Sequence, residues 1–160
     1  MKEIKTLEFK DDILYLIDQR KLPIKYEIFQ CKTYKEVDFA IQDMVVRGAP
    51  AIGATAAYGV VLAAKEFINE DKDVFYEKLD KAMNILNESR PTAVNLMWAI
   101  RRMRDLVEEN KDLEPKEIYE KILDEANKIY DEDIKTNKTM AKYGNEVIKQ
   151  GDTILTHCNA

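Results

Sequence analysis

Arg47 begins a short segment, Arg47-Gly48-Ala49-Pro50, whose residue types suit the binding of an anion. The residues after it predict a helix, so the segment would stand at a helix entrance where glycine and proline shape the turn. Exposed amides at a helix N-terminus and a guanidinium both favour a phosphate. The alternative is that Arg47 ends the preceding helix and that Gly48 is its left-handed cap.

A second arginine, Arg90, stands directly before a proline at another expected helix start, in the run Ser89-Arg90-Pro91-Thr92. Two such corners could hold one phosphorylated ligand between them. The alternative is a solvated loop arginine, since arginine side chains are mostly exposed.

The run Thr156-His157-Cys158-Asn159 places a cysteine where an expected strand ends and a loop begins. Ligands bind at such strand ends in open α/β sheets, and a cysteine there could serve as acid, base or nucleophile. Neighbouring residues on a strand face opposite sides, which argues against a dyad of His157 with Cys158. The alternative is a cysteine that only packs, which is also our interpretation of Cys31.

These candidates need elements to position them, and the first thirty residues predict short strands. Apolar runs over residues 4–9, 13–17 and 24–29 are separated by turn-forming residues. We expect these three strands to pair as a small antiparallel meander.

From residue 33 onward the pattern predicts a helical bundle. Thr33 and Glu36 have the spacing of a capping box, and apolar residues then follow one helix face to Val45. A nearly apolar helix over residues 51–68 would form the centre of the bundle. Two further helices are expected over residues 75–86 and 93–107.

The last expected helix begins at Pro115 and ends at a cap on Gly151, either unbroken or with a break near Thr136. Tyr58 and Trp98 fall on helices of the bundle, and we interpret both as core residues. A β-like run over residues 153–158 follows, and a strand after a long helix usually opens an α/β unit. The fold class we predict is α+β, with a boundary between residues 1–150 and residues 151–160.

Composition excludes several classes of protein. The 160 residues are 46% apolar and 34% charged, which is typical of a folded globular domain. The net charge of −5, with acidic residues beside the basic ones, argues against nucleic acid as the primary partner. The start lacks a secretory signal, and the uncharged residues 48–64 are too short and too weakly apolar for a membrane span. Two distant cysteines fit a reducing cytoplasm.

Three segments together resemble the methylthioribose-1-phosphate isomerase family, whose superfamily includes regulatory subunits of translation initiation factor 2B. The segments are those that begin at Val46, Ser89 and Ile154, and their order and spacing match across essentially the whole chain. The resemblance implies that residues 151–160 start a truncated Rossmann-like catalytic domain, so that 160 residues are one domain and the first strand of another.

The resemblance implies an aldose–ketose isomerisation of 5-methylthioribose 1-phosphate to 5-methylthioribulose 1-phosphate in methionine salvage, without a metal ion or organic cofactor. The family's catalytic cysteine corresponds to Cys158, and its aspartate partner would come after Ala160. The family's contacts to the phosphorylated pentose correspond to Arg47, Gly48, Ala49 and Arg90. The resemblance also implies that the full-length protein is a homodimer. We expect the 160-residue chain alone to be inactive, because a general acid without its partner retains little advantage.

Three alternatives stay open at this point. The first is a ribose-1,5-bisphosphate isomerase, although Asn95 and the run Met97-Trp98-Ala99 fit the methylthioribose type better. The second is a non-catalytic regulatory subunit of the initiation factor 2B type, which would have no reason to keep Arg47, Arg90 and Cys158 together. The third is a stable helical domain used for assembly.

Overall fold

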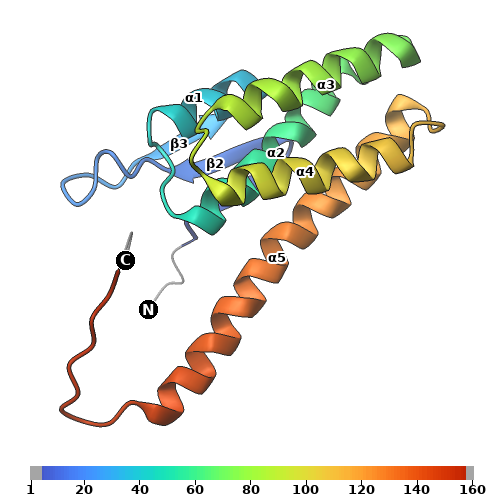
Figure 1. Cartoon of the computed structure of the whole chain (residues 1–160). Helices are drawn as coiled ribbons and strands as arrows, with labels where there is room; N and C mark the ends of the chain where they lie inside the picture. Colours follow the sequence, from blue (N-terminus) through green and yellow to red (C-terminus); the bar gives the residue numbers. More distant parts are fainter. Residues whose placement is uncertain (1–4, 158–160) are drawn as a thin grey trace.

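The structure is a computed structural model that describes residues 5–157, in which a small sheet precedes five helices (Figure 1). The strands are β1 (Leu7–Lys10), β2 (Ile13–Ile17) and β3 (Ile28–Cys31), paired antiparallel in the order β1-β2-β3. In this register Leu14 lies opposite Cys31, and both side chains are fully buried. The predicted α+β class and the β-meander are therefore confirmed.

The third strand begins later than we predicted. Residues 24–27 are in no strand, because a turn closed by a hydrogen bond from the Lys25 amide to the Lys21 carbonyl, 2.9 Å, extends past Pro23; only the Glu27 carbonyl still accepts from the Asp18 amide, at 2.9 Å. The expected first residue of β1, Ile4, lies outside the described residues.

The predicted helices are confirmed, with shifted ends, as α1 (Tyr34–Gln42), α2 (Ala49–Phe67), α3 (Lys72–Glu88), α4 (Val94–Glu109) and α5 (Pro115–Val147). The capping box of α1 is formed: the amide of Glu36 donates to the Thr33 hydroxyl, and the Thr33 amide donates to the Glu36 carboxylate.

Helix α5 is one continuous helix, without the break near Thr136 that we left open. Its predicted cap at Gly151 is wrong. The helix ends at Val147, Ile148 is extended, and Gly151 belongs to the next turn with a φ of 95°. The side chain of Asp152 stabilises that turn by accepting from the Lys149 amide at 2.7 Å.

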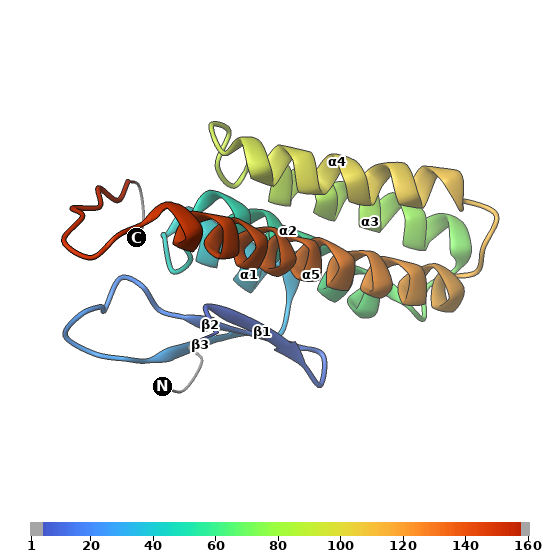
Figure 2. The ribbon, with the colours of Figure 1, turned by 90° about the horizontal axis from the view of Figure 1, so that it is seen from below.

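Helix α2 is the centre of the bundle, as predicted, and packs against α1, α3, α4 and α5. Every residue from Ile52 to Ala64 is buried. Figure 2 shows three layers, with the sheet on one side, α1, α2 and α5 in the middle, and α3 and α4 on the other side. Tyr58 lies in this core as expected, but Trp98 does not: 48% of its surface is exposed.

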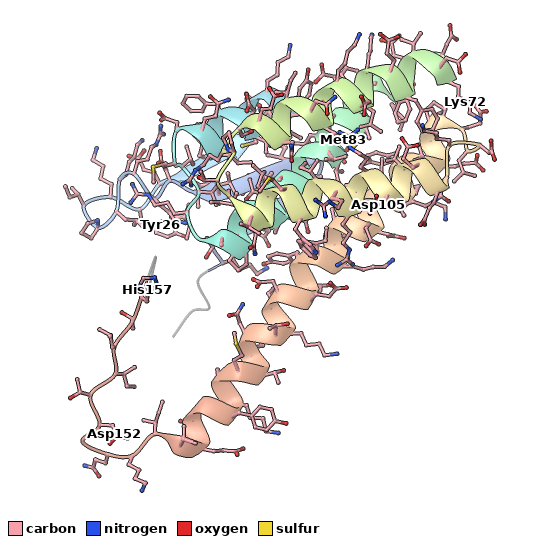
Figure 3. The ribbon with its side chains drawn as sticks, viewed as in Figure 1. Tyr26, Lys72, Met83, Asp105, Asp152 and His157 are labelled. Atoms are coloured by element: carbon pink, nitrogen blue, oxygen red, sulfur yellow. The ribbon has the colours of Figure 1, made fainter. Side chains whose placement is uncertain are left out.

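The C-terminal half of α5 runs out beyond the bundle, and the chain then turns back toward the sheet side (Figures 1 and 3). The strand predicted over residues 153–158 is wrong as far as the structure describes it, because residues 153–157 are in no strand. A β-like segment needs hydrogen-bonding partners, and no strand of the described chain pairs with it. None of the described helices has the length and apolarity needed to cross a membrane.

Candidate functional site

Gly48 stands at the entrance of α2, not at the end of α1. Helix α1 ends at Gln42, and Gly48 is the N-cap of α2 with φ 95° and ψ 127°. A side chain is strained in this backbone conformation, so the position requires glycine. Of the two interpretations of Gly48, the structure favours the helix entrance.

The segment leading to Gly48 is held by the residues that follow β2. The backbone amide of Gln19 donates to the carbonyl of Val45 at 3.0 Å, and the Gln19 side-chain amide donates to the carbonyl of Arg47 at 3.4 Å. These two hydrogen bonds from Gln19 to backbone carbonyls hold the segment that carries Arg47 close to the end of the sheet.

An ion-pair network stabilises the same connection. The Arg20 guanidinium donates to both carboxylate oxygens of Asp18, at 2.8 and 2.6 Å, and also to the carboxylate of Asp43 just after α1. The hydrogen bonds from Arg20 hold the pKa of the nearly buried Asp18 carboxyl below its ordinary value. The end of β2 and the end of α1 are tied together in this way.

Arg47 itself is left with unsatisfied hydrogen-bonding capacity. Its Nε atom is buried and has no hydrogen-bond partner, and no carboxylate in residues 5–157 forms an ion pair with the guanidinium. Buried donors of a cation are costly unless a partner satisfies them. An anion bound beside Arg47 would supply that partner.

The space for such an anion is an open pocket of about 500 Å³ beside the first turn of α2. No side chain caps that turn, and Pro50 at its start has no amide hydrogen, so the remaining amides and the helix dipole are available to a ligand. The pocket lies between the sheet, α2 and α5, and its lining includes Arg47, Gly48, Gln19, Asp133 and Asn137.

Arg90 lies in the loop between α3 and α4, and a partly buried hydrogen bond positions this loop. The hydroxyl of Ser89 donates to the carboxylate of Asp38 on α1 at 2.6 Å, and Ser89 is only 7% exposed. The carbonyl of Arg90 accepts from the Ala93 amide at 2.9 Å. Arg90 is half-buried, and no residue of the described chain pairs with its guanidinium.

The two helix entrances touch. A Cβ atom on Gly53, in the second turn of α2, would stand 2.9 Å from the carbonyl oxygen of Asn95 in the first turn of α4. Both arginines therefore precede helices that meet at their N-terminal ends, as Figure 1 shows. The pocket that Arg47 lines does not include Arg90 or Ala49, so the structure brings together Arg47 and Gly48 of the predicted set.

Cys158 lies outside the described residues, so its catalytic role stays a prediction. His157 is exposed in the segment after α5, on the same side of the molecule as Tyr26 of the β2–β3 connection (Figure 3). Cys31 is fully buried, and burial raises the pKa of its thiol to about 12. The packing role predicted for Cys31 is confirmed.

Comparison with known proteins identifies the family of the chain. The sequence model of the initiation factor 2 subunit family matches residues 45–160. The chain belongs to this family. Within the initiation factor 2 subunit family, curated relatives named methylthioribose-1-phosphate isomerase are similar to nearly the whole chain. The relatives from Thermoanaerobacter sp. strain X514 and Caldanaerobacter subterraneus are 65% and 66% identical over 159 residues.

Those 159 residues are 99% of this chain but 46% of each relative, so the chain spans about half the length of the curated relatives it matches. A solved structure of 5-methylthioribose 1-phosphate isomerase from Pyrococcus horikoshii is 43% identical with a TM-score of 0.90, over 94% of this chain and 42% of that one. The solved structure of translation initiation factor eIF-2B, subunit delta, from A. fulgidus is 40% identical in sequence with a TM-score of 0.85. The match covers 94% of this chain and 43% of that one. The resemblance stated from the sequence is confirmed.

Three polar residues that line the pocket were not predicted from the sequence. Asp133 and Asn137 come from α5, and Gln19 comes from the turn after β2. The sequence indicates only that Asp133 and Asn137, four residues apart, lie on one face of a helix. Which part of the molecule that face meets depends on the path of α5 across the bundle.

Proposed function

We propose that this chain is the N-terminal part of an aldose–ketose isomerase that converts 5-methylthioribose 1-phosphate to 5-methylthioribulose 1-phosphate in methionine salvage. The observation that carries the proposal is the buried, unpartnered Nε of Arg47 beside the uncapped start of α2. A phosphate at that corner would receive charge-assisted hydrogen bonds from the guanidinium and bonds from backbone amides. Gly48, Ala49 and Arg90 are the other proposed substrate contacts.

Catalysis in this proposal begins with ring opening. The phosphate on the anomeric carbon blocks free opening of the sugar ring, so an acid must protonate the ring oxygen before a proton or hydride moves between C2 and C1. Cys158 is the proposed catalytic group, acting with an aspartate from the sequence that follows in the longer relatives. The Arg47 corner holds the phosphate while this chemistry occurs nearby.

The test joins residues 1–160 to the remainder of the 65% identical Thermoanaerobacter relative and measures isomerisation of 5-methylthioribose 1-phosphate. Arg47→Ala should lower kcat/KM by about 100-fold, the value expected for lost hydrogen bonds to a charged group. Arg101→Ala is the matched control, because Arg101 is an exposed arginine of α4 outside the Arg47 pocket. Equal activity of both variants would contradict the proposed phosphate site.

The 160-residue chain by itself should show no turnover, because the general acid lacks its partner and the site lacks a wall that excludes water. Measurable turnover by the chain alone, abolished by Cys158→Ser, would refute this expectation. We also propose that the full-length protein is a cytoplasmic homodimer. Sedimentation of the joined protein tests the oligomeric state.

A second candidate, a non-catalytic regulatory subunit, is favoured by the similarity to the eIF-2B delta structure. The presence of Arg47, Arg90 and Cys158 in one chain favours the enzyme, because regulation alone does not need these groups. Stabilisation of the joined protein against heat by 5-methylthioribose 1-phosphate would support the isomerase. Binding to a partner subunit without any effect of the sugar phosphate would support the regulatory subunit. Comparing turnover of ribose 1,5-bisphosphate tests the related isomerase.

A further inference from the structure

The wall of the pocket opposite the start of α2 carries two polar side chains from α5, Asp133 and Asn137. They lie one helical turn apart and line the same pocket as Arg47 and Gly48. Nothing in the packing of the bundle requires them, since Asn137 is exposed and Asp133 is half-buried. This wall therefore offers a carboxylate and a side-chain amide, whereas the opposite wall offers the Arg47 guanidinium.

Hydrogen bonds orient this pair. The side-chain Nδ2 of Asn137 donates to the backbone carbonyl of Asp133 and to its carboxylate Oδ1, both at 2.9 Å. The amide nitrogen of Asn137 is therefore occupied within the helix. The Oδ1 of Asn137 and the Oδ2 of Asp133 accept no hydrogen bond from any residue in the described part of the chain. Two acceptor oxygens are left for a ligand.

We propose that Asp133 and Asn137 bind two neighbouring hydroxyl groups of the sugar whose phosphate lies at Arg47. Hydroxyl groups are the donors that suit two unpaired acceptor oxygens. This inference rests on the proposed function, because the phosphate at Arg47 sets the position of the sugar. A pocket of about 500 Å³ is of the size that holds a small phosphorylated ligand.

The charges also set the direction of the ligand. A phosphate is attracted to the Arg47 wall and repelled by the Asp133 carboxylate. A hydroxyl group is neutral and can donate a hydrogen bond to that carboxylate. The two walls together select a ligand with a phosphate at one end and a diol at the other. Asp133 and Asn137 are thus substrate-binding residues that distinguish a sugar phosphate from phosphate alone.

The experiment compares three probes by calorimetry on the 160-residue chain: inorganic phosphate, ribose 1-phosphate and 2-deoxyribose 1-phosphate. The two sugars carry the same phosphate and differ by one hydroxyl of the diol. Wild-type chain should bind ribose 1-phosphate about five-fold more tightly, the effect of about one net hydrogen bond. This ratio should fall to about one in whichever of Asp133→Ala and Asn137→Ala removes the partner of the 2-hydroxyl, and it should persist in the other variant; affinity for inorganic phosphate should be reduced in neither.

Both substitutions introduce a better helix former into α5, so the variants should fold, and circular dichroism verifies this. Asp131→Ala is the matched control, because it removes an exposed aspartate of the same helix that does not line the pocket. It should keep the wild-type ratio. Equal binding of the two sugars by the wild-type chain, or an unchanged ratio in both variants, would overturn the inference.

Arg47→Ala separates this inference from the proposed function. If inorganic phosphate binds equally well to wild-type chain and to Arg47→Ala, the proposed phosphate site fails. If Arg47→Ala weakens all three probes while Asp133→Ala and Asn137→Ala leave the sugar ratio unchanged, the phosphate site stands and the hydroxyl site fails.

Discussion

Gly53 of α2 packs against the backbone of Asn95 in α4, with its hypothetical Cβ only 2.9 Å from the Asn95 carbonyl oxygen. The neighbour is a carbonyl of a helix's first turn, which cannot move aside as a flexible side chain can. This contact fixes the distance between the two helix starts that follow Arg47 and Arg90. The geometry of the candidate site therefore depends on a residue that does not line the Arg47 pocket.

Gly53→Ala should destabilise the fold by about 2 kcal/mol, because the added methyl group forces the two helices apart. Urea unfolding followed by circular dichroism measures the change. Gly144→Ala is the matched control, since a Cβ on Gly144 of α5 meets nothing within 4 Å. That variant should gain up to about 1 kcal/mol from helix propensity. Equal stabilities of the two variants would show that the α2–α4 contact does not constrain the fold.

Asp18→Asn should destabilise the fold by about 2 kcal/mol at neutral pH, because it removes the charge that accepts two hydrogen bonds from the Arg20 guanidinium. The pKa of Asp18 is lowered from 3.8 in the folded state. Its contribution is therefore complete above pH 3.8 and is lost as the pH falls through the lower folded pKa. The difference in unfolding free energy between wild type and Asp18→Asn should shrink in that acidic range.

Glu77→Gln provides the comparison for Asp18→Asn, because Glu77 is an exposed carboxylate that forms an ion pair with Lys81 on the same helix. The free energy of unfolding should change little in Glu77→Gln at any pH, because water screens this exposed pair. A Glu77→Gln effect as large as that of Asp18→Asn would indicate a general charge effect and not the buried pair.

Ser89→Ala should loosen the loop that carries Arg90, because the half-buried carboxylate of Asp38 no longer accepts the 2.6 Å hydrogen bond from the Ser89 hydroxyl. We expect a loss of about 1 kcal/mol in stability. Hydrogen exchange should also accelerate at the Ala93 amide, which donates to the Arg90 carbonyl. Thr92→Ala, in an exposed position of the same loop, should leave that exchange rate unchanged. Unaltered exchange in Ser89→Ala would mean that the Asp38 contact does not hold the loop.

The parts of this fold that could be predicted are those that depend on residues close together in the sequence. Thr33 and Glu36 form their capping box because each satisfies an amide three residues away, and the apolar run from residue 52 is buried because no face of it is polar. Arg47 and Gly48 were identified for the same reason: a glycine and a proline beside an arginine describe a helix entrance without knowledge of the rest of the chain.

The failures concern contacts between distant residues. Residues 153–157 have strand-forming side chains, yet a strand exists only where another strand pairs with it. Trp98 follows the helix pattern but lies on the side of α4 where it stacks on the Arg102 guanidinium at 5.5 Å and stays half exposed. Asp133 and Asn137 reach the pocket only because α5 crosses the start of α2. No local pattern contains that crossing.

Cys31 should resist alkylation in the folded chain, because its side chain is fully buried and burial raises the pKa of the thiol to about 12. At pH 8 the thiolate fraction in the folded state is then negligible, and the reagent also lacks access. Iodoacetamide labelling followed by peptide mass analysis reports Cys31 and Cys158 separately. Cys31 should be modified only at the rate at which the chain unfolds, and the destabilising Gly53→Ala should accelerate its labelling. Modification of native Cys31 as fast as in denaturant would place this thiol at the surface and contradict the packing of β3 against α1.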